Sequence, residues 1–201
     1  MQLTKKTDPA TRQRILEAAL TRFASSGYTA ASIQQIVDEA QVTKPTLYYY
    51  FKSKAGLYQA LVDWGQDERF RLMQEAAALK TNLADQLSEI MASLFEFLHR
   101  NRELARISFS TAFAPPEEIP AEIDFKSKSG RNFEFIHALI SKGVQDGTLH
   151  SSFKSYDLTM ALYGLMSIYV MDFLVGSRAQ LNRQTAEMIV QIFLKGTGQK
   201  G

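Results

Sequence analysis

The sequence predicts an all-α protein of about nine helices, and three observations lead to this expectation. Apolar residues recur at helical spacing, as in Ile15, Leu16, Ala19 and Phe23, and no convincing stretch alternates with a period of two. Residues that cap or break helices stand at the ends of these stretches. The chain has 201 residues, 45% of them apolar, which is enough to fold around its own hydrophobic core.

The first two helices have recognisable starts. Asp8 is expected to cap a helix that begins at Pro9, because the fixed φ of proline suits a first turn where its missing N–H is not needed. This helix is expected to end at Gly27. A shorter helix follows from Ser32, whose hydroxyl and the amide of Gln35 have the spacing of a capping box.

The third helix is predicted directly after Gln41 and Val42. Thr43 can cap it, Pro45 lies in its first turn, and residues 47–51 (LYYYF) fill it. A fourth helix is expected to start at Ser53 and to run to about residue 79, which makes it the connection to the rest of the chain.

Five more helices are expected beyond residue 80. They cover residues 83–99, 103–113, about 121–147 with an interruption near Gly130, 157–175 with Asp157 as cap, and a last one from Asn182 or Thr185 to Gly196. Prolines 115, 116 and 120 break the chain between the second and the third of these. The stretch 158–175 reaches the lower length for a membrane span, but it contains Asp172 and lacks a flanking Lys/Arg cluster, so a buried helix is expected.

The net charge of +2 is unevenly distributed. Residues 1–60 hold eight Lys/Arg and four Asp/Glu, a net +4, and the other 141 residues hold 15 basic and 17 acidic side chains, a net −2. An anionic partner is therefore expected at the first third of the chain.

Several classes of site are excluded by composition. The sequence has no cysteine, which rules out disulfides, a thiol nucleophile and Cys-ligated metal centres. Its three histidines lack metal-ligand spacing, so no metal and no cofactor are expected. The N-terminus lacks the apolar core of a secretory signal, and a cytoplasmic location is expected.

The segment from residue 32 to 54 has the pattern of a helix-turn-helix. Two short capped helices are separated by two residues, and the second carries Lys44, Thr46, Tyr48 and Tyr49. Hydroxyl and ammonium groups suit phosphate oxygens, aromatic faces suit sugars and thymine methyl groups, and the helix N-terminus favours an anion. A tyrosine-rich core helix with solvated lysines is the alternative interpretation.

These residues resemble the N-terminal domain of the TetR (tetracycline-repressor-like) family of bacterial transcription regulators. The resemblance covers residues 11–19 (TRQRILEAA), 23–24, 27–30 (GYTA), 32–37 (SIQQIV) and 42–57 (VTKPTLYYYFKSKAGL), about 50 of the 201 residues. It implies a DNA-binding domain at residues 1–54 and a helical effector-binding and dimerisation domain at residues 55–201. It also implies a homodimer whose recognition helices, residues 43–51, enter the major groove of a palindromic operator roughly 34–36 Å apart or somewhat more.

The resemblance also implies roles for single residues. Thr43, Lys44, Pro45 and Thr46 are the candidates for base contacts, Tyr48 and Tyr49 for backbone and base contacts, and Ser32, Ile33 and Lys54 for phosphate contacts. Pro45 stands where the family most often has a small residue, and Tyr50 stands where it usually has histidine. Lys5, Lys6 and Arg12 either add contacts through an arm or are solvated charges.

The family's C-terminal domain binds a small molecule that changes the spacing of the two DNA-binding heads. The side chains that could line such a pocket are apolar or aromatic, with two histidines: Trp64, Phe95, His99, Phe109, Phe113, Phe133, His137, Tyr163, Met166 and Tyr169. The same spacing is typical of core residues, so both interpretations stay open. A largely apolar or aromatic effector is expected.

The last two helices are expected to form the dimer surface, a four-helix bundle with the partner's copies. The candidates are more apolar than a monomer can comfortably expose: Leu158, Leu162, Leu165, Met188, Ile192 and Phe193. Burial in the core of the single chain is the alternative.

The function that these observations predict is that of a homodimeric, DNA-binding transcriptional regulator. It is expected to be a repressor that a small-molecule effector releases from its operator, and not an enzyme. The alternative is a helical enzyme or small-molecule carrier whose basic N-terminal region serves another partner.

Overall fold

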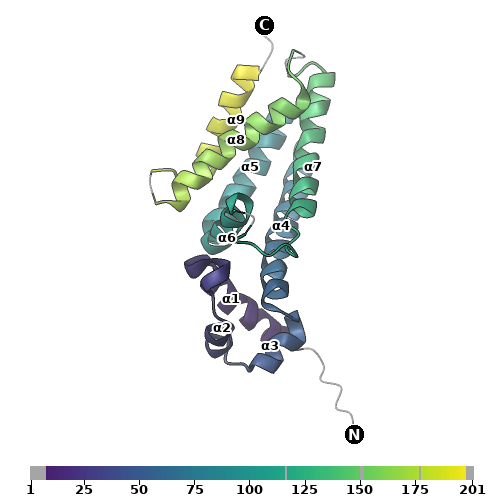
Figure 1. Ribbon diagram of the computed structural model, residues 1–201. Helices are drawn as coiled ribbons and strands as arrows, with labels where there is room; N and C mark the ends of the chain where they lie inside the picture. Colours follow the sequence, from purple (N-terminus) through teal and green to yellow (C-terminus); the bar gives the residue numbers. More distant parts are fainter. Residues whose placement is uncertain (1–7, 116, 150–151, 177, 198–201) are drawn as a thin grey trace. The chain divides into compact units, whose positions relative to one another are not determined.

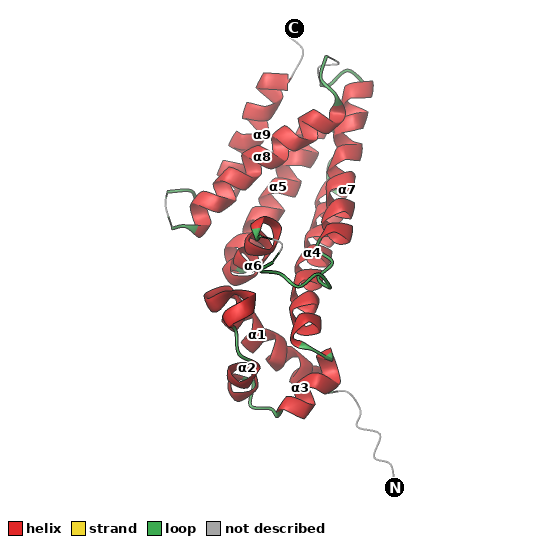
Figure 2. Ribbon diagram, in the orientation of Figure 1, coloured by secondary structure: helices red, strands yellow, loops and turns green. Residues whose placement is uncertain are grey.

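The computed structural model describes residues 8–115, 117–149, 152–176 and 178–197. Within these ranges all regular structure is helical, as Figure 2 shows, which confirms the predicted fold class. The helices, in the order seen in Figure 1, are α1 (Pro9–Ala30), α2 (Ile33–Glu39), α3 (Lys44–Phe51), α4 (Lys54–Ala78), α5 (Leu83–Arg100), α6 (Arg102–Phe113), α7 (Lys126–Gln145), α8 (Ser155–Leu174) and α9 (Arg183–Thr197).

The chain packs as two compact units. The first contains Met1–Gly65 and Glu103–Phe125, and the second contains Gln66–Arg102 and Lys126–Gly201. Helix α4 therefore contributes to both, and α6 with the following segment belongs to the first. This division by packing differs from the expected division of function between residues 54 and 55, which stays a prediction.

In the first unit, α1, α2 and α3 pack against one another around a core of buried aliphatic and aromatic side chains. The ring of Tyr58 lies edge-on to Phe23, with centroids 4.9 Å apart, and to Tyr28, at 5.2 Å. The Tyr58 hydroxyl hydrogen-bonds Thr111 Oγ1 at 2.6 Å, which anchors α6 in this unit. Gly27 has φ 76° and breaks α1 where its end is predicted, although helical structure resumes up to Ala30.

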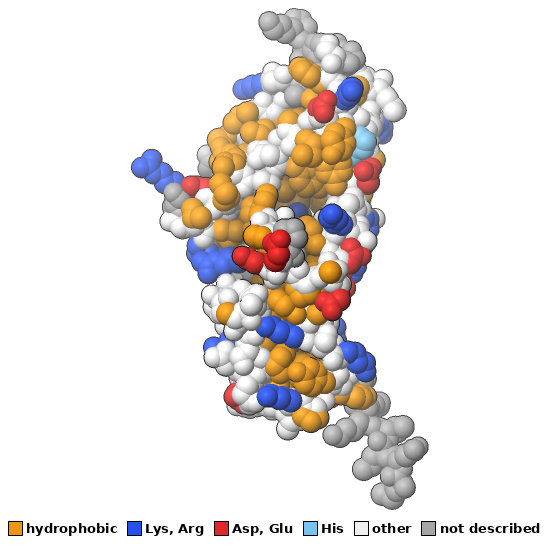
Figure 3. Space-filling view, in the orientation of Figure 1, with side chains coloured by type: hydrophobic (Ala, Val, Ile, Leu, Met, Phe, Trp, Pro, Cys, Tyr) orange, Lys and Arg blue, Asp and Glu red, His pale blue; other side chains and the backbone are white. Residues whose placement is uncertain are grey.

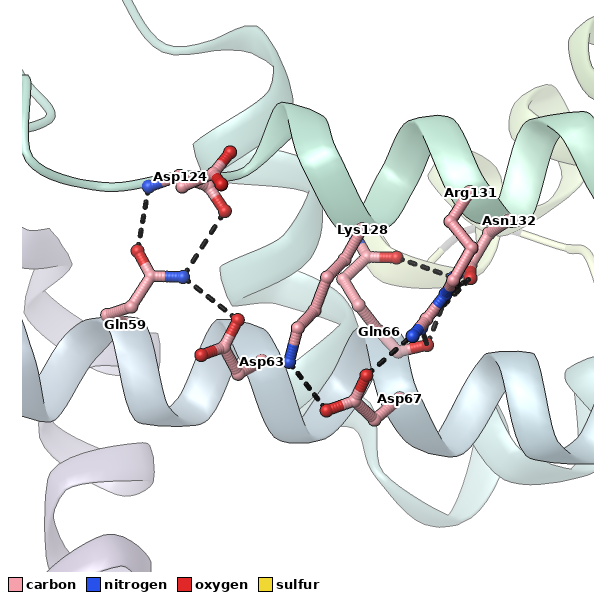
Figure 4. A network of polar contacts seen from close by, with 8 residues as sticks. All are labelled: Gln59, Asp63, Gln66, Asp67, Asp124, Lys128, Arg131 and Asn132. Carbon is pink, nitrogen blue, oxygen red and sulfur yellow. Dashed lines mark hydrogen bonds and ion pairs between the residues drawn. The ribbon is translucent and has the colours of Figure 1, made fainter.

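Residues 120–125 do not continue into the next helix as predicted, and α7 begins only at Lys126. Ile123 and Phe125 pack against the core of the first unit, and the Gln59 side chain clamps the segment. Its amide oxygen accepts from the Asp124 N–H (2.7 Å), and its amide nitrogen donates to the Asp124 carbonyl (3.2 Å) (Figure 4). These contacts hold the backbone in turns and delay the helix start.

In the second unit, α5 packs against α9, and α8 packs against α7 and α9. Two further sequence predictions are wrong here. Helix α7 continues without interruption through Gly130, which faces open space, and α8 begins after Lys154, so that Asp157 lies in its first turn instead of capping it. A carboxylate in a first turn still complements the helix dipole.

Helix α8 is long and apolar enough to cross a membrane by length and composition, with a mean hydropathy of 1.3. A single such helix is weak evidence for a span, because the core helix of a water-soluble protein passes the same test. Only 28% of its most apolar stretch is buried within the chain, so much of its apolar surface is left for another contact.

Candidate nucleic-acid interface

Both short helices begin at the predicted caps. The Ser32 hydroxyl accepts a hydrogen bond from the Gln34 N–H at 3.2 Å, and the Thr43 hydroxyl accepts one from the Thr46 N–H at 3.3 Å. Each hydroxyl satisfies a backbone donor that the first turn leaves without a partner. The starts of α2 and α3 are therefore fixed by residues that can be read from the sequence.

The turn between α2 and α3 is a Schellman motif. The Val42 N–H donates to the Val37 carbonyl (2.9 Å) and the Gln41 N–H to the Asp38 carbonyl (3.2 Å), while Gln41 takes a positive φ of 52°. Glycine usually fills this position, so a glutamine there does not predict the turn. The motif ends α2 abruptly and turns the chain directly into α3.

Helix α3 has one buried and one exposed side. Leu47 and Phe51, one turn apart, are buried in the core of the first unit. Thr43, Lys44 and Pro45 are exposed, and Tyr48 and Tyr49 are 41% and 50% exposed. The residues predicted to contact bases thus lie on the accessible side, with Thr46 half-buried among them.

Tyr50 ties the start of α1 to α3. Its hydroxyl accepts from the Asp8 N–H at 2.9 Å and donates to the Asp8 carbonyl at 3.2 Å. An open hollow beside this contact is lined by Asp8, Thr11, Thr43, Pro45, Thr46, Tyr49 and Tyr50. The tyrosine that departs from the family pattern therefore positions the N-terminus of α1 against α3.

The junction between α3 and α4 is unusually tight. Lys52 has φ 65° and ψ −42°, and the Ser53 N–H bonds the Phe51 carbonyl at 2.7 Å, a γ-turn of the strained kind. The Ser53 hydroxyl accepts from the Gly56 N–H at 2.9 Å, and a Cβ at Gly56 would lie 2.2 Å from the Phe51 oxygen. The predicted start at Ser53 is confirmed, and the absence of a side chain at Gly56 is what lets the two helices meet.

Lys54 is held within the first unit. Its ammonium donates to the Thr29 carbonyl at 3.1 Å and lies 4.7 Å from the centre of the Tyr28 ring. Burial lowers the pKa of Lys54 below its usual range. The residue thus joins α4 to the end of α1, a role that sequence reasoning missed, and two of its N–H groups remain for a phosphate.

The other candidates for phosphate contact lie at the start of α2, on α1 or outside the described residues. Ser32 and Ile33 are half-buried, and Ile33 packs against the core. Arg12 lies over the Phe51 ring at 5.2 Å. Lys5 and Lys6 lie outside the described residues. Figure 3 shows Lys and Arg side chains interleaved with hydrophobic ones on the visible face of the first unit, a pattern that suits a nucleic-acid-binding surface.

The ten predicted pocket residues do not gather at one place. Tyr163 and Met166 line a small apolar cavity of the second unit, together with Leu87, Ile90, Met91, Leu94, Ile136 and Leu162. The Phe133 ring lies tilted against the rings of His137, Tyr156 and Tyr163, and Phe95 is fully buried. His99 lies against Phe173, and Tyr169 lines a surface hollow at the end of α8.

The remaining three pocket candidates belong to the first unit. Phe109 and Phe113 are neighbours on α6, with ring centroids 5.7 Å apart, and Phe113 is largely exposed. Trp64 is also exposed. None of the three is among the residues that line the cavity with Tyr163 and Met166.

The predicted dimer residues divide into two groups. Leu158, Leu162 and Phe193 are buried in the core of the single chain, so they are not available to a partner, and Leu165 is half-buried. Met188 and Ile192 are exposed, as are Met160, Ile168, Met171 and Val175, which the prediction did not include. Figure 3 shows apolar side chains gathered over this part of the second unit.

Residues 15–61 match the family model described as bacterial regulatory proteins, tetR family. The chain is 26% identical over 159 residues to the transcriptional activator FasR of Mycolicibacterium smegmatis, covering 79% of this chain and 68% of FasR. It is 25% identical over 178 residues to a probable acrEF/envCD operon repressor of Escherichia coli, covering 86% and 80%.

The fold is also that of solved regulators. The ketosteroid transcriptional regulator KstR2 of Mycobacterium tuberculosis superimposes with a TM-score of 0.76 at 17% identity, over 99% of this chain and 98% of KstR2. Residues 15–61 are therefore similar in sequence to the tetR family model, and the chain as a whole is similar in fold to a solved regulator.

Proposed function

Since this chain is a DNA-binding transcriptional regulator of the TetR family, we propose that it acts as a repressor on a palindromic operator. In this proposal it binds the operator as a homodimer and is released by a small, largely apolar or aromatic ligand. Its relatives include a named activator and a named repressor, and we infer repression because the proposed ligand site can shift the dimer away from its DNA-binding shape.

The exposed side of α3 is the observation that carries the proposal. Leu47 and Phe51 fix the helix in the core, and its N-terminal residues face outward within the stretch that the family model matches. We infer that Thr43, Lys44, Pro45 and Thr46 contact base edges and that Tyr48 and Tyr49 contact bases and backbone. Ser32, Ile33 and Lys54 then contact phosphates at the rim.

The homodimer is proposed to form through α8 and α9. Met160, Ile168, Met171 and Ile192 are each about half exposed, an apolar surface that a stable monomer rarely leaves to water. A two-fold contact of these helices makes each exposed side chain face the same surface of the partner.

A ligand response requires a site in the second unit. The cavity lined by Tyr163 and Met166 supports this part of the proposal, because its walls are almost entirely aliphatic. KstR2 is named for ketosteroids, which are apolar as well. The similarity to regulators favours this proposal over an enzyme or a carrier.

Titration of fluorescently labelled duplexes from the region upstream of the protein's own gene tests the proposal. We expect binding that survives an excess of unrelated DNA and that weakens steeply with salt. Tyr49→Ala should lose this binding while circular dichroism stays unchanged. Absence of competitor-resistant binding to any upstream fragment by the intact dimer would sink the proposal.

A further inference from the structure

The second unit contains an arginine whose Nε is buried and which has no anionic partner among the described residues. Arg69, on α4, has an Nε that is completely enclosed and makes no hydrogen bond to any described residue. Burial lowers the pKa of its guanidinium, which stays protonated at neutral pH, and no Asp or Glu among the described residues contributes to that pKa. The side chain as a whole is only half-buried, so a small molecule can still reach it.

The neighbouring cations of the same unit are paired. Arg131 and Lys128, on α7, share the Asp67 carboxylate at 3.0 Å and 2.6 Å, as Figure 4 shows. Arg71, on α4, pairs with Glu68 and Glu75. Burying a charge is costly unless a counter-charge and hydrogen bonds accompany it, and the enclosed Nε of Arg69 has neither among the described residues.

A second polar group beside Arg69 is also without a partner. Gln66 lies one turn earlier on α4, and its side-chain oxygen accepts from Asn132 Nδ2 at 2.9 Å. Its Nε2 is buried and has no hydrogen-bond partner in the part of the chain that the structure describes. Both unsatisfied groups are donors, and none is an acceptor, which is the pattern that an anion's oxygens complete.

Tyr163 connects these donors to the apolar cavity. Its hydroxyl donates to the Asn132 carbonyl at 3.2 Å. Burial raises the pKa of Tyr163, and the nearby Arg69 charge offsets part of this rise. The same tyrosine lines the cavity with Leu87, Met91 and Met166. The cavity is small, and the flexible thioethers of the two methionines can repack around an entering group.

We propose that the effector is an amphiphilic anion, whose carboxylate or equivalent oxyanion binds Arg69 and Gln66 and whose apolar body lies past Tyr163 in the cavity. This inference deepens the proposed ligand response and rests on it. It changes the expected effector class, since a purely apolar compound leaves the guanidinium and the amide donors unsatisfied.

Isothermal titration of the full-length dimer with straight-chain alkanoates of four to twelve carbons, each paired with the alcohol of equal length, tests the inference. At least one alkanoate should bind ten- to a hundredfold more tightly than its alcohol, a difference of about 1.4–2.8 kcal/mol. Arg69→Gln should abolish this preference and leave the affinity for the alcohol unchanged. Arg69→Lys should keep part of it.

Arg71→Gln is the matched control, because it removes a paired, exposed guanidinium from the same helix. It should leave both affinities unchanged. The thermal unfolding temperature of the ligand-free Arg69→Gln variant should be no lower than that of the wild type, because the substitution removes a partly buried charge that has no counter-charge among the described residues. A marked fall in this temperature would indicate that Arg69 has a purely structural role and would overturn the inference.

Equal affinity for alkanoates and alcohols, no binding of any alkanoate, or a preference that persists in Arg69→Gln would each contradict the anion site. A parallel titration with operator DNA keeps the two proposals apart. If DNA binding is specific and an alcohol releases it as well as the acid does, the regulator stands and the anion inference fails. If no specific DNA binding occurs, the proposed function fails whatever the alkanoates do.

Discussion

The exposed side of α3 and the exposed side of α8 and α9 differ in chemistry. Helix α3 turns threonines, a lysine and tyrosines outward, and its apolar residues Leu47 and Phe51 are buried. Helices α8 and α9 leave methionine, isoleucine and valine outside even though they also have a buried side. A polar and aromatic surface can contact phosphates and bases, and an aliphatic one excludes water only against another aliphatic surface. We therefore propose that DNA binds the first surface and that a second copy of the chain binds the other.

The largest expected effect is at the apolar surface. Ile168→Glu places a charge on each side of a two-fold contact and removes two buried isoleucines, a loss of about 3–5 kcal/mol of dimer stability. Sedimentation velocity should show monomers at concentrations where the wild type is dimeric. Gln74→Glu, at an exposed position of α4, is the control and should stay dimeric. If the Ile168→Glu protein stays dimeric, the dimer interface lies on another surface of the chain.

The next effect concerns the junction that holds the polar surface. Gly56→Ala puts a Cβ 2.2 Å from the backbone oxygen of Phe51, and we expect the free energy of unfolding to fall by about 2–3 kcal/mol. Chemical denaturation measures this. Gly130→Ala faces open space inside α7 and should instead stabilise the protein by about 0.5–1 kcal/mol. Equal stability of the Gly56→Ala protein and the wild type would show that the close approach is not essential.

Charge removal should separate the two surfaces by their salt dependence. Lys44→Ala removes one phosphate or base-edge contact per subunit, so operator affinity should fall by about 1–2 kcal/mol and the slope of log K against log salt should flatten by up to about two per dimer. Lys126→Ala removes an exposed lysine from the second unit and should change neither quantity. An equal effect of both variants would mean that total charge, not the α3 surface, attracts the DNA.

The smallest effect is expected at Tyr50. Tyr50→Phe removes two hydrogen bonds to the Asp8 backbone and should reduce the free energy of unfolding by about 0.5–1.5 kcal/mol, with a further loss of operator affinity. Tyr48→Phe alters an exposed hydroxyl on the same helix and should leave stability unchanged. Equal free energies of unfolding for the two variants would show that the Tyr50 hydroxyl does not stabilise the contact between α1 and α3.

Features of local origin could be predicted from the sequence. The caps at Asp8, Ser32 and Thr43 each depend on one side chain and the backbone a few residues away, so their spacing predicts them. The turn at Gln41 could not be predicted, because its positive φ is held by the bonds around it and not by a glycine. The late start of α7 depends on Gln59, 65 residues from its partner Asp124, and no local pattern signals that.

Which side of an apolar helix is buried in the chain's own core is harder to predict from the sequence. Leu158, Leu162 and Phe193 have the spacing of interface residues, but in an apolar helix the side that faces the chain's own core and the side that faces a partner have the same composition. No sequence pattern distinguishes Arg69 from other arginines, because a single arginine on a helix is nearly always solvated. Only its enclosed Nε and the missing carboxylate distinguish it.

Selection of bound duplexes from a library of genomic fragments tests the assignment of DNA to the α3 surface most directly. The wild-type dimer should enrich fragments that share one inverted repeat, and Tyr49→Ala, folded and dimeric, should enrich none. Enrichment of the same repeat by the Tyr49→Ala protein would contradict the role of α3, and absence of any shared repeat with the wild type would contradict sequence-specific DNA binding itself.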